Sequence, residues 1–416
     1  MNISEEKYLV EDGDGLSEMQ KDSILDDAID PSKARAMLPV KEINKIFLTG
    51  ATGFLGTYLL SELLNQTKAD IYCLVRASDE QEGIHRLKEC FEKYLTWDKA
   101  YDSRIIPVLG DLSMPLLGLS EEQFDNLSAT IHAIYHSGAM VNFLYTYSHH
   151  RSANVLGTHE ILKLAVRYRI KPVHYISTLY TFFYNTYKEK TLIREQEIFT
   201  RNENYGPGYA QSKLVAERLM VAARERGLPV SIYRPGRITG DVNTGACQPE
   251  DLLWRSMKAC IEIQAVPDIE MLIDMAPVDY VSSAIVKISQ KEDALGKNYH
   301  LGNPEFMTAA EFYKIVSTLG FSLKTMNFNQ WKTALVAASK KSAQSASLIV
   351  IPFIRGGHFN NSHVLYDQTN TYQALAGTGI ECPKISKELL QVYFDYFYTI
   401  GFVKKPVWDQ LLPEIV

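Results

Sequence analysis

The sequence predicts an α/β protein with a doubly wound parallel sheet and a smaller, mainly helical C-terminal domain. From Lys45 onward, short and almost continuously apolar runs alternate with helical stretches. Strands of this kind are typical of a parallel sheet that is covered by helices on both faces. A glycine-rich turn follows the first apolar run, and the alternation fades after Thr239.

The predicted elements follow one another in a regular order. Strands are expected in the runs KIFLTG, DIYCLVRA, RIIPVLGDL, AIYHSGA, PVHYIST and VSIYRPG. Helices are expected at about 54–66, around 86–94 and 155–168, and from about Tyr209 to Arg226. The later runs MAPVDYV and NYHLGNP are interpreted as returns to the sheet, and the remainder is predicted to be mainly helical.

Three parts are therefore expected along the chain. Residues 1–40 are interpreted as a lead-in or linker, in which SILDDAIDPSKA forms an irregular segment or a short helix ending near Pro31. Residues 41–240, with returning segments at about 273–303, form the nucleotide-binding domain. Residues 241–416 form a discontinuous substrate domain over the carboxyl edge of the sheet, where ligands bind in such folds.

Composition excludes several classes of protein. A net charge of −6 argues against nucleic-acid binding, which needs a surplus of lysine and arginine. The five cysteines are scattered without C-x-x-C spacing, so we expect neither disulfides nor zinc, and a reducing cytoplasm. No apolar run approaches the ~20 residues that span a membrane. The adjacent His149 and His150 are interpreted as a solvated or capping pair, and no metal site is predicted.

The run KIFLTGATGFLG predicts a phosphate-binding turn. Gly50, Gly53 and Gly56 lie between the first strand and the first helix. Glycines here allow a tight turn and close approach of the backbone to a pyrophosphate, and the helix N-terminus supplies N–H donors.

The end of the second strand predicts the cofactor. A site for NAD usually has an acid there, about 20 residues after the glycines. This chain instead has Arg76, which can pair with a 2′-phosphate, so NADPH is expected. Arg86 is a second phosphate candidate or an exposed helix arginine. Asp111 and Leu112 are candidates for contact with the adenine, although Asp111 could equally cap its own loop.

A hydride-transfer site is predicted from three further residues. Tyr209 and Lys213 are four residues apart at the start of a helix and therefore share one face. Thr178 is at the end of a neighbouring strand, and Ser177 is the alternative hydroxyl. A nearby ammonium is expected to lower the pKa of the Tyr209 phenol, which would then protonate a reduced oxygen that Thr178 also contacts.

Together these motifs resemble a known family. The glycine turn, GDL, the ST pair and Y-x-x-x-K are similar to extended short-chain dehydrogenases/reductases. More narrowly, TGATGFLG, YCLVRA, HSGAMVNFLYTY, NVLGTHEILKLA, YRPGRITGD and PVDYV resemble the thioester reductase domains that end nonribosomal peptide synthetases and carboxylic acid reductases. The resemblance covers about residues 22–402.

The resemblance implies further site residues. It matches Thr178, Tyr209 and Lys213 to the family's catalytic triad. The implied additional cofactor contacts are Thr52, Phe54, Leu55, Ser137, Gly138, Ala139, Asn154, Pro235, Gly236 and Ile238. The run TLYTFFYN after the triad threonine is bulkier and more aromatic than the family pattern, which leaves the shape of the substrate entrance open.

The implied reaction is NADPH-dependent reductive release of an acyl or peptidyl thioester from the phosphopantetheine arm of a carrier protein. The product is an aldehyde, and a second reduction would give an alcohol. The resemblance also implies a monomeric terminal domain that follows a carrier domain, with basic residues of the C-terminal domain expected to contact the carrier.

Other functions are compatible with parts of this pattern. Soluble fatty acyl-CoA reductases share the turn, the arginine and the triad. Sugar-nucleotide epimerases and dehydratases share the fold but favour an acid after the second strand. An NADPH-sensing or scaffold protein would not require the triad. Comparing carrier-bound with CoA-bound thioesters distinguishes the two reductases, and NADPH consumption distinguishes an enzyme from a sensor.

Overall fold

The computed structural model describes residues 14–182, 192–198, 206–342, 345–355 and 364–406, and the chain forms two compact units. The first unit comprises Met1–Ile238, Val278–Gly302 and Val364–Glu381, and the second comprises Thr239–Pro277, Asn303–His363 and Cys382–Val416. The sequence interpretation assigns residues 364–381 to the C-terminal domain, whereas their contacts group them with the sheet-containing unit.

A seven-stranded sheet lies at the centre of the first unit, and each of its strands pairs in parallel with its neighbours. The spatial order is β12 (Asn298–Leu301), β7 (Val230–Pro235), β5 (Val173–Ile176), β4 (Ala133–His136), β1 (Lys45–Thr49), β2 (Asp70–Val75) and β3 (Ile105–Leu109). The chain winds outward from β1 to β3 and then resumes at β4 on the other side of β1. This arrangement confirms the predicted fold class and puts a topological switch point at the ends of β1 and β4.

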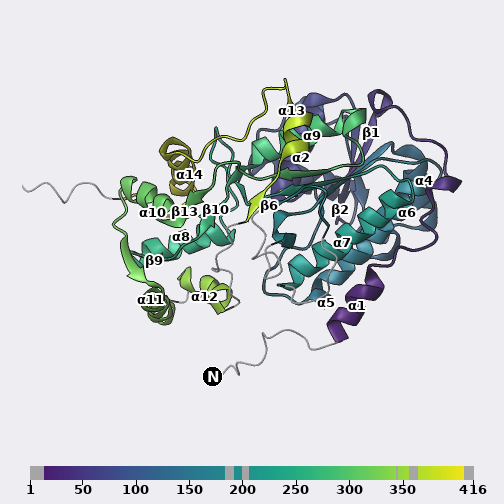
Figure 1. Ribbon diagram of the computed structural model, residues 1–416. Coiled ribbons are helices and arrows are strands. Elements are labelled where there is room, and N and C mark those ends of the chain that lie inside the picture. Colours follow the sequence, from purple (N-terminus) through teal and green to yellow (C-terminus); the bar gives the residue numbers. More distant parts are fainter. Residues whose placement is uncertain (1–13, 183–191, 199–205, 343–344, 356–363, 407–416) are drawn as a thin grey trace, which may run out of the picture. The chain divides into compact units, whose positions relative to one another are not determined.

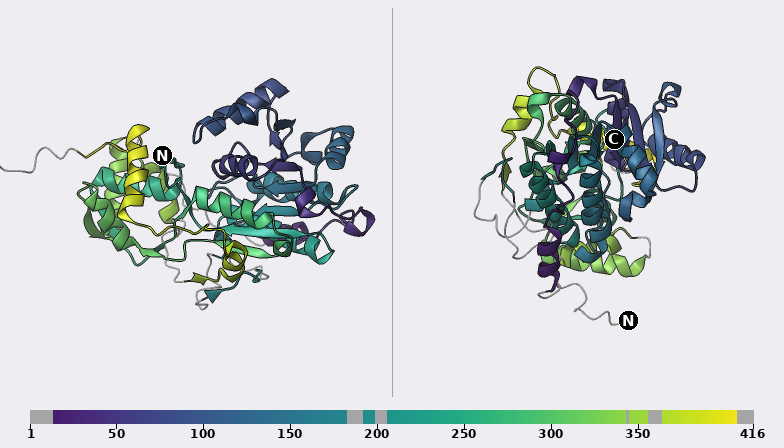
Figure 2. Two further views of the ribbon diagram at one scale, coloured as in Figure 1. Left: turned by 90° about the horizontal axis from the view of Figure 1, so that it is seen from above. Right: turned by 90° about the vertical axis from the view of Figure 1, so that its right-hand side faces the viewer.

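Helices cover both faces of this sheet (Figures 1 and 2). Figure 1 shows α6 and α7 on one face and α2 with α9 on the other. The helices of this unit are α1 (Asp14–Asp22), α2 (Phe54–Gln66), α3 (Glu80–Glu92), α4 (Glu121–Thr130), α5 (Tyr147–His150), α6 (Gly157–Val166), α7 (Gly208–Glu225), α9 (Val278–Ser289) and α13 (Thr369–Leu375). A π-helical segment, Arg151–Leu156, connects α5 to α6.

The predicted helices at 54–66 and from Tyr209 are confirmed by α2 and α7. Helix α3 begins earlier than predicted, because the Asp79 carboxylate accepts the N–H of Glu82 and caps the first turn. The buried apolar side of α7, which includes Val215 and Leu219, packs into the same core as Ile232 of β7.

The lead-in segment differs from its prediction. Its helix, α1, ends at Asp22, and a separate 3-10 turn covers Pro31–Lys33. The Asp22 carboxylate accepts the Tyr147 hydroxyl at 2.7 Å and two guanidinium N–H groups of Arg151 at 2.6 and 2.7 Å. These bonds attach α1 to the π-helical segment beside the sheet.

One of the two predicted returns to the sheet is wrong. NYHL forms β12 and completes the sheet, but MAPVDYV does not enter it. Its first residues form β11 (Ala276–Pro277) in a separate two-stranded sheet, and α9 begins at Val278. The apolar residues Val278, Val281 and Ile285 are buried at helical spacing, which explains why a helix forms there.

Residues 192–198 and 364–381 are neighbours in the first unit. Strand β6 (Leu192–Ile193) pairs in parallel with β15 (Leu365–Tyr366), and α13 packs on β12.

The second unit is mainly helical. It contains α8 (Leu252–Ile263), α10 (Ala309–Thr318), α11 (Phe328–Lys341), α12 (Ser347–Arg355) and α14 (Lys387–Thr399), with the strand pairs β9 (Ala265–Asp268) with β14 (Lys324–Asn327) and β10 (Leu272–Ile273) with β13 (Met307–Thr308). Its core is centred on the buried side chains of Trp254, Trp331 and Tyr393. No helix in the described part of the chain is long and apolar enough to cross a membrane.

Candidate active site

The glycine turn between β1 and α2 is closely packed. Gly50 has φ +80°, and a Cβ on it would lie 2.7 Å from the backbone nitrogen of Gly138. A Cβ on Gly56 would lie 1.8 Å from the carbonyl oxygen of Gly50. The Gly53 N–H donates to the same carbonyl at 2.8 Å, and α2 begins at the next residue, Phe54. The turn therefore presents a helix N-terminus at the switch point, which suits a pyrophosphate.

A buried histidine joins this turn to the loop after β4. The Thr49 hydroxyl accepts the Gly138 N–H at 2.9 Å and lies 2.8 Å from Nδ1 of His136. Burial, with a smaller contribution from the charge of Lys213, lowers the pKa of His136 to about 3. The ring is therefore neutral, and Nδ1 accepts the Thr49 proton. Sequence reasoning did not select His136, although it precedes the predicted Ser137–Ala139 stretch.

Asn154 lies in the π-helical segment and is fully engaged with the protein. Its Oδ1 accepts the Met140 N–H at 2.7 Å, and its Nδ2 donates to the Met140 carbonyl at 3.0 Å and to the Ser212 hydroxyl at 2.9 Å. Ser212 in turn donates to the carbonyl of Tyr209 at 2.8 Å. Asn154 thus connects the loop after β4 to the first turn of α7.

The residues predicted to select the cofactor gather beyond β2 and β3. Arg76 is exposed at the end of β2, and the Arg86 guanidinium donates to its carbonyl oxygen. The Asp111 carboxylate accepts the N–H and the hydroxyl of Ser113 at 2.8 and 2.7 Å, so it caps its loop. Burial would raise the pKa of Asp111, but these bonds and the charge of Arg76 lower it overall. Leu112 is half-buried, and its carbonyl packs against the start of α6.

The remaining implied contacts lie along the same edge. Pro235 ends β7, the Gly236 N–H donates to the carbonyl of Leu301 at 3.1 Å, and Ile238 follows. Because the strands are parallel, the segments after β1, β2, β3, β4, β5 and β7 all leave the sheet at one side.

Lys213 is a buried cation at the end of β5. It is 3% exposed, and its Nζ donates to the carbonyl of Ile176 at 2.6 Å. The same Nζ lies 4.4 Å from the centroid of the Tyr175 ring. Burial lowers the pKa of Lys213 to about 7, and the negative charge of Glu217 opposes that shift. The lysine is thus poised between its charged and neutral forms near neutral pH.

The predicted lowering of the Tyr209 pKa is wrong for this structure. Tyr209 is 9% exposed in the first turn of α7, and burial raises the pKa of its phenol. The expectation counted the nearby ammonium but not the desolvation of a phenolate, which a sequence does not reveal. Tyr209 therefore keeps its proton and can donate it in a hydrogen bond.

The two hydroxyl candidates after β5 have different surroundings. Ser177 is buried and donates its proton to a carboxylate oxygen of Glu217. Thr178 is half-buried, and its Oγ1 accepts the N–H of Tyr180 at 3.1 Å. A hydroxyl that accepts in this way still has its own proton to donate. The geometry therefore favours Thr178 over Ser177 as the second donor.

Aromatic rings surround Tyr209. Phe143 packs edge-on against it, with ring centroids 5.3 Å apart, and His150 lies at 6.0 Å. The prediction of a solvated or capping pair is wrong for His150, which is fully buried and donates from Nε2 to the carbonyl of Asn142 at 2.9 Å. The signal in the sequence was its position three residues after Tyr147, on the same buried side of α5.

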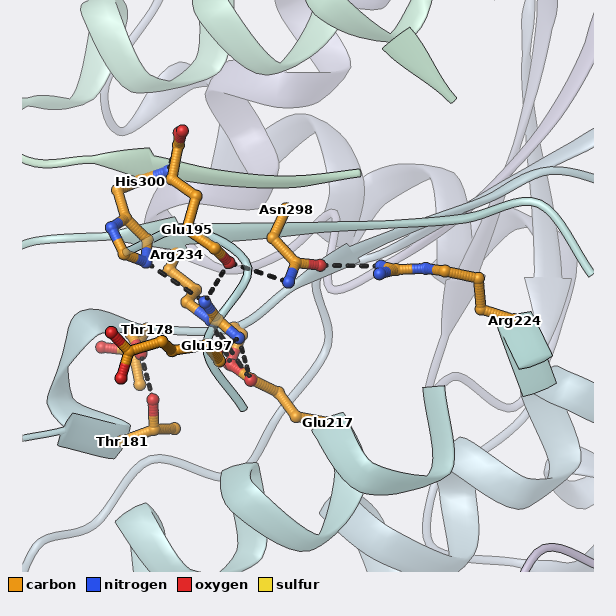
Figure 3. Close-up of polar contacts among 10 residues, drawn as sticks. Thr178, Thr181, Glu195, Glu197, Glu217, Arg224, Arg234, Asn298 and His300 are labelled. Carbon is orange, nitrogen blue, oxygen red and sulfur yellow. Dashed lines mark hydrogen bonds and ion pairs between the residues drawn. The ribbon is translucent and has the colours of Figure 1, made fainter. Parts of the chain in front are cut away.

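Sequence reasoning also missed Glu217 and Arg234. Glu217 continues the stripe of Tyr209 and Lys213 along α7 at a spacing of four residues, and Arg234 lies in the run YRPG. Both are buried, and they form an ion pair below the end of β5 (Figure 3). In the described ranges, no group of three or more histidine, cysteine, aspartate or glutamate side chains could hold a metal ion.

Comparison with known proteins agrees with this geometry. The family described as "Male sterility protein" matches residues 48–285, which include the glycine turn, Thr178, Tyr209 and Lys213. The crystal structure of the terminal R domain from the myxalamid PKS-NRPS biosynthetic pathway is 44% identical, with a TM-score of 0.89 over 94% of this chain and 100% of that one. The chain belongs to this family.

Curated relatives contain the same region within longer proteins. A linear gramicidin synthase protein of Brevibacillus parabrevis is 42% identical over 374 residues, which are 89% of this chain and 7% of the synthase protein. The protein named aldehyde reductase lnaA of Aspergillus flavus is 34% identical over 372 residues, 85% of this chain and 36% of that protein. The chain thus spans only a small part of these relatives.

These findings confirm the resemblance seen in the sequence. The chain has the extended short-chain dehydrogenase/reductase fold of terminal reductase domains, and it is an oxidoreductase of the class that uses a nicotinamide cofactor.

The glycine turn makes a direct prediction. Replacing Gly56 by alanine forces the Gly50 carbonyl to move, and overpacking of this kind costs about 1–3 kcal/mol. We therefore expect Gly56→Ala to weaken binding of the dinucleotide cofactor by roughly tenfold or more, measured by fluorescence titration. Asn65→Ala, on the exposed side of α2, is the control and should bind normally. Unchanged affinity in Gly56→Ala would show that the turn does not cradle the cofactor.

Proposed function

We propose that this chain catalyses NADPH-dependent reductive release of an acyl or peptidyl thioester from a carrier protein, giving an aldehyde. The observation that supports it most is the gathering of Tyr209, Lys213 and Thr178 at the sheet edge that also carries the glycine turn. The family relatives add that such domains belong to peptide synthetases and reductases.

In this proposal, NADPH when bound supplies the hydride that reduces the thioester carbonyl. Tyr209, as a neutral phenol, donates a hydrogen bond to the carbonyl oxygen while negative charge develops on it. Thr178 donates the second hydrogen bond. Lys213 contributes a positive charge beside the reacting oxygen and hydrogen-bond donors for the cofactor's ribose. Both roles require the protonated ammonium.

Release of the product then needs no covalent bond to the protein. Collapse of the reduced adduct expels the pantetheine sulfur as a thiolate, which is a good leaving group because a simple thiol has a pKa of about 8.5. Burial raises the pKa of the thiols of Cys73, Cys247 and Cys260, which makes them poor nucleophiles. These properties favour direct hydride transfer over an acyl-enzyme route.

The proposed preference for NADPH comes from the end of β2. Arg76 is exposed there, and Arg86 is held next to it by its bond to the Arg76 carbonyl. Both guanidinium groups can reach toward a 2′-phosphate, which arginine binds in forked geometry. Asp111 spends its carboxylate on Ser113, so its proposed contact with the adenine would have to share those bonds.

The proposed partner is a carrier protein whose phosphopantetheine arm presents the thioester. The gramicidin synthase protein and the terminal R domain both come from assembly lines that build peptides. Lys340 and Lys341, at the end of α11 in the second unit, are candidates for contact with an acidic carrier. We further propose that the domain acts as a monomer in the cytoplasm.

Removal of the phenolic hydroxyl tests the proposed chemistry. We expect Tyr209→Phe to lower kcat by about 10²–10⁴-fold, the usual contribution of a positioned proton donor, while NADPH still binds. The assay follows NADPH absorbance with a carrier-bound thioester, and Tyr145→Phe, at an exposed tyrosine, is the control. A wild-type rate in Tyr209→Phe would exclude this residue as the proton donor. Faster turnover of acyl-CoA than of the carrier-bound thioester would indicate a fatty acyl-CoA reductase.

Replacement of Arg76 tests the choice of cofactor. A hydrogen bond to a charged group contributes about 1.5–3 kcal/mol, so Arg76→Ala should lower kcat/KM for NADPH by roughly 10–100-fold and change that for NADH little. Lys88→Ala removes an exposed cation from α3 and should leave the ratio unchanged. An unaltered NADPH-to-NADH ratio in Arg76→Ala would contradict the assignment.

A further inference from the structure

A fully buried ion pair lies beneath the proposed reduction site (Figure 3). The side chains of Glu217, on α7, and Arg234, on β7, are 1% and 0% exposed. The Arg234 Nη2 lies 2.7 Å from Oε2 of Glu217, and its Nε lies 3.0 and 3.2 Å from the two carboxylate oxygens. Burying two charges is costly unless the geometry is good and other bonds complete it.

Arg234 has such bonds for every donor. A guanidinium carries five N–H groups, and those not used on Glu217 donate to the carbonyls of Glu195 and Glu197, at 3.0 and 2.9 Å, and to Nε2 of His300 at 3.1 Å. His300 can accept there because burial keeps its pKa well below the usual value. Arg234 is therefore held on all sides, and it fixes the carboxylate of Glu217 in place.

The carboxylate of Glu217 has a further partner on β5. It accepts the Ser177 hydroxyl, and the Ser177 N–H donates to the carbonyl of Tyr233 at 2.7 Å. Thr178 follows immediately in the chain. The ion pair thus reaches the strand end that carries the second proposed proton donor.

The same carboxylate acts on Lys213, one helical turn earlier. The charged or titratable groups that face Lys213 are Glu217 and Tyr209 from α7, Tyr175 from β5 and His136 from β4. Tyr209 and Tyr175 are neutral because burial raises the pKa of both phenols, and His136 is neutral because burial lowers its pKa. Glu217 is therefore the charged group among these four that stabilises the ammonium.

We propose that Glu217, held by Arg234, is a positioning residue of the reduction site. It keeps Lys213 in its ammonium form at the end of β5, and through Ser177 it fixes the strand end that carries Thr178. The inference rests on the proposed function for the role of Lys213, but it concerns the binding of NADPH as well as turnover.

A merely structural ion pair would affect stability and nothing else, so the test measures how cofactor affinity depends on pH. In the wild type, NADPH affinity should fall as the pH rises through the pKa of Lys213. Glu217→Gln removes the negative charge and keeps the shape. We expect the midpoint of that fall to move to lower pH by roughly one unit, measured by fluorescence titration without turnover. Glu217→Asp keeps the charge and should restore at least part of the shift.

Glu195→Gln is the matched control. Glu195 is equally buried, but its carboxylate accepts N–H groups of His300, Asn370 and Thr371, and it is not among the groups that face Lys213. It should lower the melting temperature without moving the midpoint. A midpoint in Glu217→Gln equal to that of the wild type, or an equal shift in Glu195→Gln, would overturn the proposal.

Ser177→Ala provides a milder variant if Glu217→Gln does not fold. It leaves the ion pair intact and removes only the bond to β5. We expect kcat to fall by about threefold or more from misplacement of Thr178, while the pH midpoint of NADPH binding stays in place. An unchanged kcat would remove Ser177 from the proposal. If the wild type binds NADPH but reduces no thioester, the proposed function fails while the pH test still judges the role of Glu217.

Discussion

The burial of a lysine ammonium against the last carbonyl of β5 is the constraint that organises this site. A cation that has left water needs acceptors, and Lys213 finds them in the Ile176 carbonyl and the face of the Tyr175 ring. Glu217 supplies the opposite charge, and a buried carboxylate in turn needs a cation, which Arg234 provides. The polar core beneath the sheet edge is therefore a consequence of one buried charge.

The fold holds this cation in register with the rest of the sheet edge. Helix α7 is tied to the loop after β4 by Asn154 and Ser212, and that loop is tied to the glycine turn through Thr49. Local features with no chemistry of their own, such as the π-helical segment that carries Asn154, are thus part of the site. A change in one of these connections should alter cofactor and donor positions together, because they share a single network.

Local patterns predicted the sheet, the turn at Gly50 and helix α7, because each depends on neighbours in the chain. They did not predict the Glu217–Arg234 pair, whose partners are brought together by a helix and a strand. The direction of the Tyr209 pKa shift was also beyond them, since it depends on how deeply the ring is buried. The same reason explains His150, which is polar in sequence and buried in the structure.

The ionisation of Lys213 tests the central claim most directly. Carbon-13 labelling at the ε position of lysine, with Lys213→Arg to assign the signal, allows its titration to be followed by NMR in the cofactor-free protein. A midpoint near 7 agrees with a buried ammonium that the surrounding groups hold only partly charged. A midpoint near the ordinary lysine value of about 10.4 would mean that the ammonium is solvated, and the account of the site would then be contradicted.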